Sequence, residues 1–164
     1  MRKEESAMKI VIIGDGKVGF KLAKQLSEEN YDIVLIDPNE GKLKETINRL
    51  DIFCITGDGV SAEVQKQADV PHADLVIACA STDELNMLSC LIARRRGARH
   101  TIARVRNPVY PLLVRRLNLS VNHLVHEEQY KKQPKIVQLD LFTDFEESER
   151  QRKADLELSL IHIL

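Results

Sequence analysis

The sequence predicts an α/β domain in which a parallel β-sheet carries helices on both faces. Short apolar runs rich in β-branched residues recur along the chain without polar alternation, which is typical of strands buried on both sides. Between these runs, apolar residues recur at helical spacing. Strands that alternate with helices need crossover connections, and these connections produce a parallel sheet.

The first strand is predicted at residues 9–13 and is followed at once by a glycine-rich turn. Gly14, Gly16 and Gly19 form the pattern G-x-G-x-x-G, and a helix is predicted over 18–29. In this pattern Gly14 makes the tight turn, Gly16 lets the backbone approach a pyrophosphate, and Gly19 lets the helix pack against the strand. A phosphate at this turn would meet unpaired N–H groups and the positive end of the helix dipole.

A second buried strand is predicted at 31–37, and it ends in Asp37. Its separation from Gly19 matches that of the acidic residue that accepts hydrogen bonds from the adenosine ribose in dinucleotide sites. The charge of Asp37 would repel a 2′-phosphate, so the pattern favours NAD over NADP. The alternative is a structural turn in which Asp37, before Pro38, is the N-terminal residue of a helix. We favour the dinucleotide site.

The rest of the chain continues the alternation. The predicted elements are a helix at 39–50, a strand at 52–56, a helix at 61–68, a strand at 74–80, a helix that is capped by 81–84 and ends before Gly97, a strand at 100–105, a helix at 110–117 and a strand at 121–125. Ser61 is the expected N-cap of the third helix. Leu85, Leu88, Leu91 and Ile92 form the apolar stripe of the fourth helix.

These elements predict a doubly wound, Rossmann-like domain over residues 8–130, with a six-stranded parallel sheet. Residues 1–7 are expected to be a disordered lead-in. Residues 131–164 are an extension to which we assign no structure.

Composition excludes several function classes. The chain has 24 Lys and Arg against 25 Asp and Glu, a net charge of −1, so its charge gives no case for a nucleic-acid partner or an anionic membrane surface. The three cysteines Cys54, Cys79 and Cys90 lie in apolar contexts without metal-ligand spacing, as expected of reduced thiols in a cytoplasmic protein. No apolar stretch is long enough to span a bilayer.

Ligands of parallel sheets lie outside the carboxyl ends of the strands. The candidate cofactor-binding residues are therefore Gly14, Asp15, Gly16, Lys17, Val18, Gly19, Asp37, Pro38, Gly57, Asp58, Ala80, Ser81, Thr82, Asp83 and Arg104. Asp58 either binds an adenine amino group or caps the helix that begins near Ser61. Ser81 and Thr82 face a ribose or phosphates, or provide an N-cap.

Arg104 lies in an otherwise apolar strand and needs an anionic partner. The candidates are a ligand phosphate and the carboxylates of Asp83 and Glu84. The sequence shows no set of catalytic residues and no metal cluster, and its histidines are scattered. A dinucleotide site without catalytic groups predicts a sensor and not an enzyme.

These motifs also carry a family resemblance. The segments MKIVIIGDGKVG, LIDPNE, ITGDG, IACASTDELNMLSCLIARRRGA and TIARVRNPVY resemble the nucleotide-binding domain of TrkA-type potassium-uptake regulators, also called KTN or RCK N-terminal domains, over about residues 8–130. The resemblance implies a cytoplasmic regulatory subunit that binds NAD or NADH, or alternatively ATP or ADP. It also implies assembly into dimers and higher rings beneath a membrane potassium transporter, whose gating responds to the nucleotide.

The resemblance also draws attention to Glu128, which matches a family glutamate near the dimer interface and is a weak candidate for a cation ligand. Here His126 and Glu127 replace the family's small residue and proline. Two alternatives remain beside the regulator, namely an NAD-dependent oxidoreductase fragment and an assembly module with a vestigial nucleotide site.

Overall fold

The computed structural model describes residues 7–116 and 123–126. The strands are β1 (Lys9–Ile13), β2 (Asp32–Asp37), β3 (Phe53–Thr56), β4 (Leu75–Ala78), β5 (His100–Val105) and β6 (His123–His126). The helices are α1 (Lys17–Glu28), α2 (Glu40–Ile47), α3 (Ala62–Gln67), α4 (Asp83–Arg96) and α5 (Val109–Arg116), with a 3₁₀ turn η1 at Val70–His72. The expectations for the lead-in, for Glu128 and for the extension after residue 130 fall outside the described residues.

The strands form one parallel sheet in the order β3-β2-β1-β4-β5-β6. Strand β1 lies between β2 and β4, with Ile12 opposite Leu35 on one side and Ile77 on the other. From β1 the chain adds β2 and β3 on one side of the sheet. It then crosses back and adds β4, β5 and β6 on the other side of β1. The predicted doubly wound fold is confirmed, and its topological switch point lies between β1 and β4.

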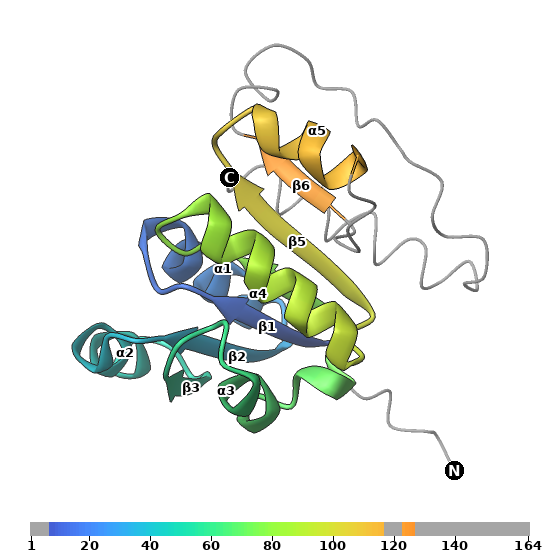
Figure 1. Ribbon diagram of the computed structural model, residues 1–164. Coiled ribbons are helices and arrows are strands. Elements are labelled where there is room, and N and C mark those ends of the chain that lie inside the picture. The colour runs from blue at the N-terminus through green and yellow to red at the C-terminus, as the bar shows by residue number, and fades with distance from the viewer. Residues whose placement is uncertain (1–6, 117–122, 127–164) are drawn as a thin grey trace. The chain divides into compact units, whose positions relative to one another are not determined.

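Helices cover both faces of this sheet. Figure 1 shows α4 in front of the sheet and α1 behind it. Val11 and Ile13 of β1 pack with Cys90 and Ala93 of α4 in one buried cluster. Because side chains alternate along a strand, Ile10 and its even-numbered neighbours face α1 and α2.

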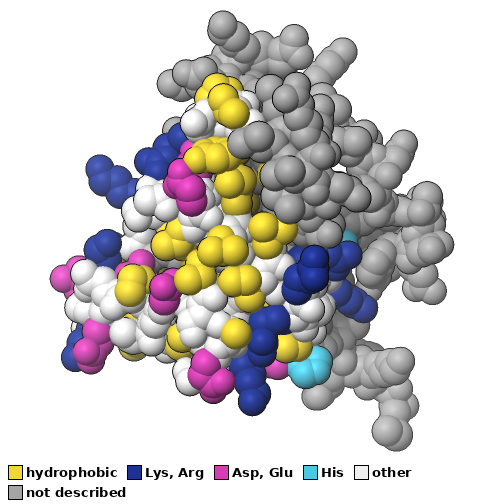
Figure 2. Space-filling model, viewed as in Figure 1, with side chains coloured by type: hydrophobic (Ala, Val, Ile, Leu, Met, Phe, Trp, Pro, Cys, Tyr) yellow, Lys and Arg dark blue, Asp and Glu magenta, His cyan; other side chains and the backbone are white. Residues whose placement is uncertain are grey.

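Helix α4 approaches the sheet mainly through small and polar side chains, while Leu85 of its leucine stripe is partly buried against the same core. Its buried residues are Asp83, Asn86, Ser89, Cys90 and Ala93. Leu88 remains 48% exposed, and Val109 of α5 is 51% exposed. Figure 2 shows apolar side chains gathered on the face that α4 covers. Leu88 of the stripe therefore contributes to an apolar surface, because small residues allow α4 to lie close to the strands.

Several element boundaries differ from the prediction. Helix α2 ends at Ile47, because the N–H groups of Arg49 and Leu50 both bond the carbonyl of Thr46 in a closing turn. Strand β4 ends at Ala78, which leaves residues 79–82 for the turn into α4. The η1 turn was not predicted and follows Asp69, whose backbone is left-handed with φ 56°.

Candidate functional site

Glycine occupies the β1–α1 turn where a side chain would collide with the chain. A Cβ on Gly14 would lie 2.8 Å from the backbone of Ala80, and its φ of +108° is left-handed. A Cβ on Gly19 would lie 1.7 Å from the carbonyl oxygen of Gly14. Nothing lies within 4 Å of the Cβ position of Gly16, the N-cap of α1. Gly14 and Gly19 thus hold the turn against β4 and α1, while Gly16 faces open space.

Asp37 joins the glycine turn to the end of β2. The residue is 8% exposed, and its Oδ2 accepts a hydrogen bond of 2.8 Å from the N–H of Asp15. Its Oδ1 accepts a second bond of 2.8 Å from the N–H of Asn39. Helix α2 begins with Asn39 as its N-cap, so Asp37 is not the first residue of that helix. Because a carboxylate oxygen has two acceptor positions, both oxygens can accept a further donor.

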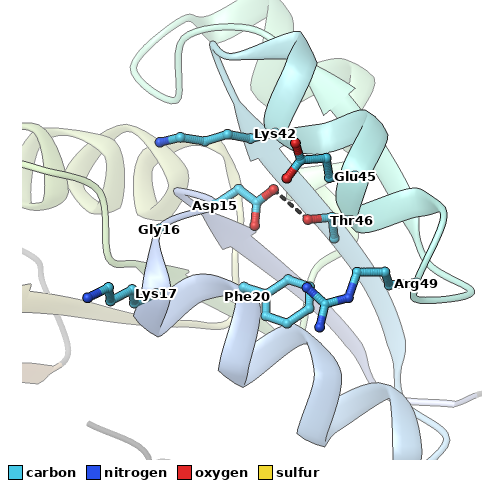
Figure 3. Close-up of a pocket in the computed structure, with 8 residues that line it drawn as sticks. All are labelled: Asp15, Gly16, Lys17, Phe20, Lys42, Glu45, Thr46 and Arg49. Atoms are coloured by element: carbon cyan, nitrogen blue, oxygen red, sulfur yellow. Dashed lines mark hydrogen bonds between the residues drawn. The ribbon is translucent and has the colours of Figure 1, made fainter.

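Asp15 directs its side chain away from the turn and toward α2, as Figure 3 shows. Its Oδ2 accepts a hydrogen bond of 2.7 Å from the hydroxyl of Thr46, and the residue is 6% exposed. Burial raises the pKa of the Asp15 carboxyl, against the Thr46 hydrogen bond that lowers it, and the charge of Asp37 raises it further. This carboxyl is therefore easier to protonate than an ordinary aspartic acid.

A pocket of about 380 Å³ adjoins Asp15 between the glycine turn and α2 (Figure 3). It is lined by Asp15, Gly16, Lys17, Phe20, Lys42, Glu45, Thr46 and Arg49. The guanidinium of Arg49 stacks 4.5 Å from the ring centre of Phe20. Sequence reasoning named Asp15, Gly16 and Lys17 but missed Phe20 of α1 and the pocket residues from α2 and the turn after it. A signal existed, because Thr46 lies three residues after the buried Leu43 and shares its helix face.

The β4–α4 turn is fixed by two side chains of α4. Thr82 is the N-cap, and its hydroxyl accepts a bond of 3.3 Å from the N–H of Leu85. Asn86 is 1% exposed. Its Oδ1 accepts from the N–H of Ala80 at 2.7 Å, and its Nδ2 donates to the carbonyl of Arg104 at 2.8 Å. Asn86, which was not among the predicted site residues, therefore joins the turn to β5.

Asp83 faces the chain that follows β5. Its Oδ2 accepts bonds of 2.9 Å and 2.8 Å from the N–H groups of Arg106 and Asn107. Burial opposes ionisation of Asp83, but these backbone donors outweigh it and hold its pKa below the usual value. Glu84 accepts a hydrogen bond from the hydroxyl of Tyr110. Both carboxylates considered as partners of Arg104 thus bind groups of the β5–α5 segment.

The β3–α3 turn completes the edge of the sheet. Asp58 is exposed, and its Oδ1 accepts from the N–H of Val60 at 3.0 Å. The cap of α3 is Ser61, whose hydroxyl accepts from the N–H of Val64 at 3.4 Å. The prediction for Ser61 is confirmed, and the capping alternative for Asp58 is wrong, because Asp58 closes the preceding turn instead.

Direct contacts bring the predicted site segments together at the carboxyl ends of the strands. Gly14 touches Ala80, Asp15 binds Asp37, and the N–H of Gly57 donates to the carbonyl of Asp37 at 3.0 Å. Lys17, Pro38, Ser81 and Thr82 are exposed around them, and Val18 and Arg104 are half-buried.

Within the described ranges, no group of three or more His, Cys, Asp or Glu side chains is arranged to hold a metal ion. A search of the same residues finds no helix with the length and hydropathy of a membrane span.

The chain is similar to known proteins in both sequence and structure. The family model named TrkA-N domain matches residues 10–127. The TrkA homologue of the Trk potassium uptake system of Archaeoglobus fulgidus is 39% identical over 103 residues, which are 63% of this chain and 23% of that protein. TrkA of Halomonas elongata is 42% identical over 104 residues, with coverage of 63% and 23%. The chain thus spans about a quarter of the length of these relatives.

Solved structures share the fold. The TrkA-N domain of the inner membrane protein ybaL from Escherichia coli has a TM-score of 0.67 at 18% identity, with 76% of this chain and 91% of that chain covered. The GsuK channel bound to NAD has a TM-score of 0.63 at 23% identity, with coverage of 75% and 22%. Because the family model matches most of this chain, the chain belongs to the TrkA-N domain family.

Proposed function

We propose that this chain is the nucleotide-binding domain of a regulatory subunit for potassium uptake, and that NAD or NADH is its ligand. The observation that carries the proposal is the contact between Asp37 and the glycine turn. It places an acidic acceptor beside a turn whose middle glycine faces open space. A dinucleotide needs both groups, one for the adenosine ribose and one for the pyrophosphate.

In this proposal the ligand lies across the switch point of the sheet. The pyrophosphate approaches the N–H groups of the glycine turn at residues 14–19, and Asp37 accepts hydrogen bonds from the ribose hydroxyls. Gly57 and Asp58 flank the adenine. Residues 80–83 and Arg104 lie toward the second half of the dinucleotide.

The relatives support a regulatory role and not an enzymatic one. Relatives that are 39% and 42% identical are potassium uptake proteins, and solved GsuK structures are bound to NAD and to ADP. Such a subunit would act on the cytoplasmic side of a membrane potassium transporter. The nucleotide could then alter the transporter only by binding two conformations of the assembly with different affinities.

Self-association is part of the same proposal. The apolar surface on the α4 face, where Leu88 of α4 is half exposed, supports contact with a second copy of the chain (Figure 2). Contiguous apolar surface of this kind is typical of protein interfaces.

The proposal is tested by thermal unfolding of the protein with NAD, NADH, NADPH, ATP and ADP in parallel. A ligand that binds only the folded state must raise the unfolding temperature. We expect an increase with NAD or NADH and little change with NADPH. An increase in unfolding temperature with ATP or ADP alone would mean that the domain senses adenine nucleotides and not the redox state of NAD. No increase with any of the five would refute nucleotide binding, and net oxidation of NADH would favour an oxidoreductase.

A further inference from the structure

A second buried acid lies under the glycine turn, next to the place where the proposed ligand carries its diphosphate. Asp15 belongs to the turn itself, and its backbone N–H is bound by Asp37. Asp37 receives two backbone N–H donors. The carboxylate of Asp15 receives one donor among the described residues, the Thr46 hydroxyl. Of the two acids, Asp15 therefore has the weaker support for a negative charge.

We propose that Asp15 makes nucleotide binding proton-linked, so that the protein takes up a proton at this carboxyl as a diphosphate enters the glycine turn. This inference rests on the proposed nucleotide function. It gives that function a regulatory input, because the affinity for the ligand then depends on pH.

The groups around Asp15 explain why the pKa of its carboxyl is raised. Burial is the largest influence and favours the neutral acid, and the charges of Asp37 and Glu45 act in the same direction. Lys42 favours the charged form, as does the Thr46 hydroxyl. Lys17 and Arg49 line the same pocket, and on β3 burial and then the Asp15 charge raise the pKa of the Cys54 thiol to about 11.

A bound diphosphate changes this balance in one direction. Its negative charge enters the turn of which Asp15 is part, and a like charge at short range disfavours the ionised carboxyl. Lys42, which favours the charged form of Asp15, would then also interact with the ligand. Proton uptake at Asp15 removes the repulsion.

The structure accommodates both protonation states of Asp15. The pocket of about 380 Å³ reaches the residue from the solvent side, which provides a route for the proton (Figure 3). A hydroxyl is both donor and acceptor. The 2.7 Å contact with Thr46 can therefore persist, with the carboxylate accepting before binding and the acid donating after it.

The test is calorimetric titration of NADH into the full chain from about pH 5 to pH 8, in buffers that differ in ionisation enthalpy. We expect net proton uptake on binding. The affinity for NADH should fall as the pH rises, by about tenfold in total for each unit by which the ligand raises the pKa of one carboxyl. Asp15→Asn should abolish both the uptake and the pH dependence. Asp32→Asn, at the exposed start of β2, is the matched control and should behave as wild type.

Two further arms separate proton linkage from a purely structural role. Thr46→Val removes the donor that favours the charged form and should move the pH dependence to higher pH, whereas Thr46→Ser should restore it. Adenosine, which has no diphosphate, should bind without proton uptake.

The outcomes distinguish this inference from the proposed function. NADH binding without proton uptake, or the same uptake in Asp15→Asn, would overturn the role of Asp15 and leave nucleotide binding intact. Absence of any NADH binding to the wild-type chain would overturn both.

Discussion

Asp37 holds two turns together with one carboxylate, so we expect a change at this residue to lower stability and, under the proposed function, to weaken NADH binding. In Asp37→Ala the N–H groups of Asp15 and Asn39 lose their acceptor. We expect the free energy of unfolding to fall by about 1–3 kcal/mol. NADH affinity should fall by about 10–100-fold, since a hydrogen bond to a charged group contributes roughly 1.5–3 kcal/mol.

Urea unfolding and calorimetric titration measure the two effects separately. Asp37→Asn is the control, because it keeps the shape and one acceptor oxygen and should lose less stability. Unchanged NADH affinity in a folded Asp37→Ala protein would refute the ribose contact.

Asp15 predicts a pH dependence of stability that needs no ligand. Its pKa is raised in the folded state, chiefly by burial, so the folded protein binds this proton more tightly than the unfolded chain. Its contribution is therefore fully present below the ordinary pKa of aspartic acid and is lost as the pH rises through the folded-state value. Relative to wild type, Asp15→Asn should gain stability from acidic to neutral pH. Urea unfolding of both proteins at acidic and at neutral pH measures this gain. An equal difference in the free energy of unfolding between variant and wild type at the two pH values would contradict it.

At the scale of elements, two glycines of the turn between β1 and α1 should have different roles. We expect Gly19 to matter for stability and Gly16 to matter for NADH binding. Gly19→Ala would place a methyl group 1.7 Å from the Gly14 carbonyl oxygen. We expect it to destabilise the protein by about 3 kcal/mol or more, because the backbone must move. Gly16→Ala has open space and should change stability by no more than about 1 kcal/mol.

The two glycine variants are compared by thermal unfolding and by NADH titration. A folded Gly16→Ala protein should bind NADH more weakly, because its methyl group occupies the side from which the pyrophosphate approaches. Wild-type affinity in this variant would show that the ligand does not use the turn.

Asn86 links β4, α4 and β5 and should be costly to remove. Asn86→Ala leaves the buried N–H of Ala80 and the carbonyl of Arg104 without this partner. The expected loss is about 2–4 kcal/mol in urea unfolding, because unsatisfied buried groups cost about 1–3 kcal/mol each. Asn48→Ala, at the exposed C-cap of α2, should change stability by less than about 0.5 kcal/mol. A similar loss in the two variants would refute the linking role.

The sequence predicted the elements better than the contacts between them. Strands such as β1 and β4 were predicted because a short, continuous run of apolar residues is typical of a strand that is buried on both faces. The backbone partners of Asp83 were not predicted. Arg106 and Asn107 follow β5, and they come near the start of α4 only because the chain runs from α4 back through the sheet as β5. The α2 side of the pocket was missed for the same reason. Its residues meet the glycine turn only after α1 and α2 pack on one face.

At the scale of the whole described domain, the candidate site joins the two halves of the sheet. Its segments come from β1, β2 and β3 on one side of the switch point and from β4 and β5 on the other. A ligand that spans them would couple the two halves, which is the property a regulatory domain needs. We therefore expect a dinucleotide to bind across the carboxyl ends of these strands.

The most direct measurement of that claim is the change in backbone amide NMR shifts when NADH is added. We predict that the largest changes fall on the glycine turn at residues 14–19, on Asp37 and on residues 80–82, which lie on both sides of the switch point. Absence of shifts, or shifts confined to a surface away from these segments, such as the α4 face, would show that no dinucleotide binds at this edge of the sheet.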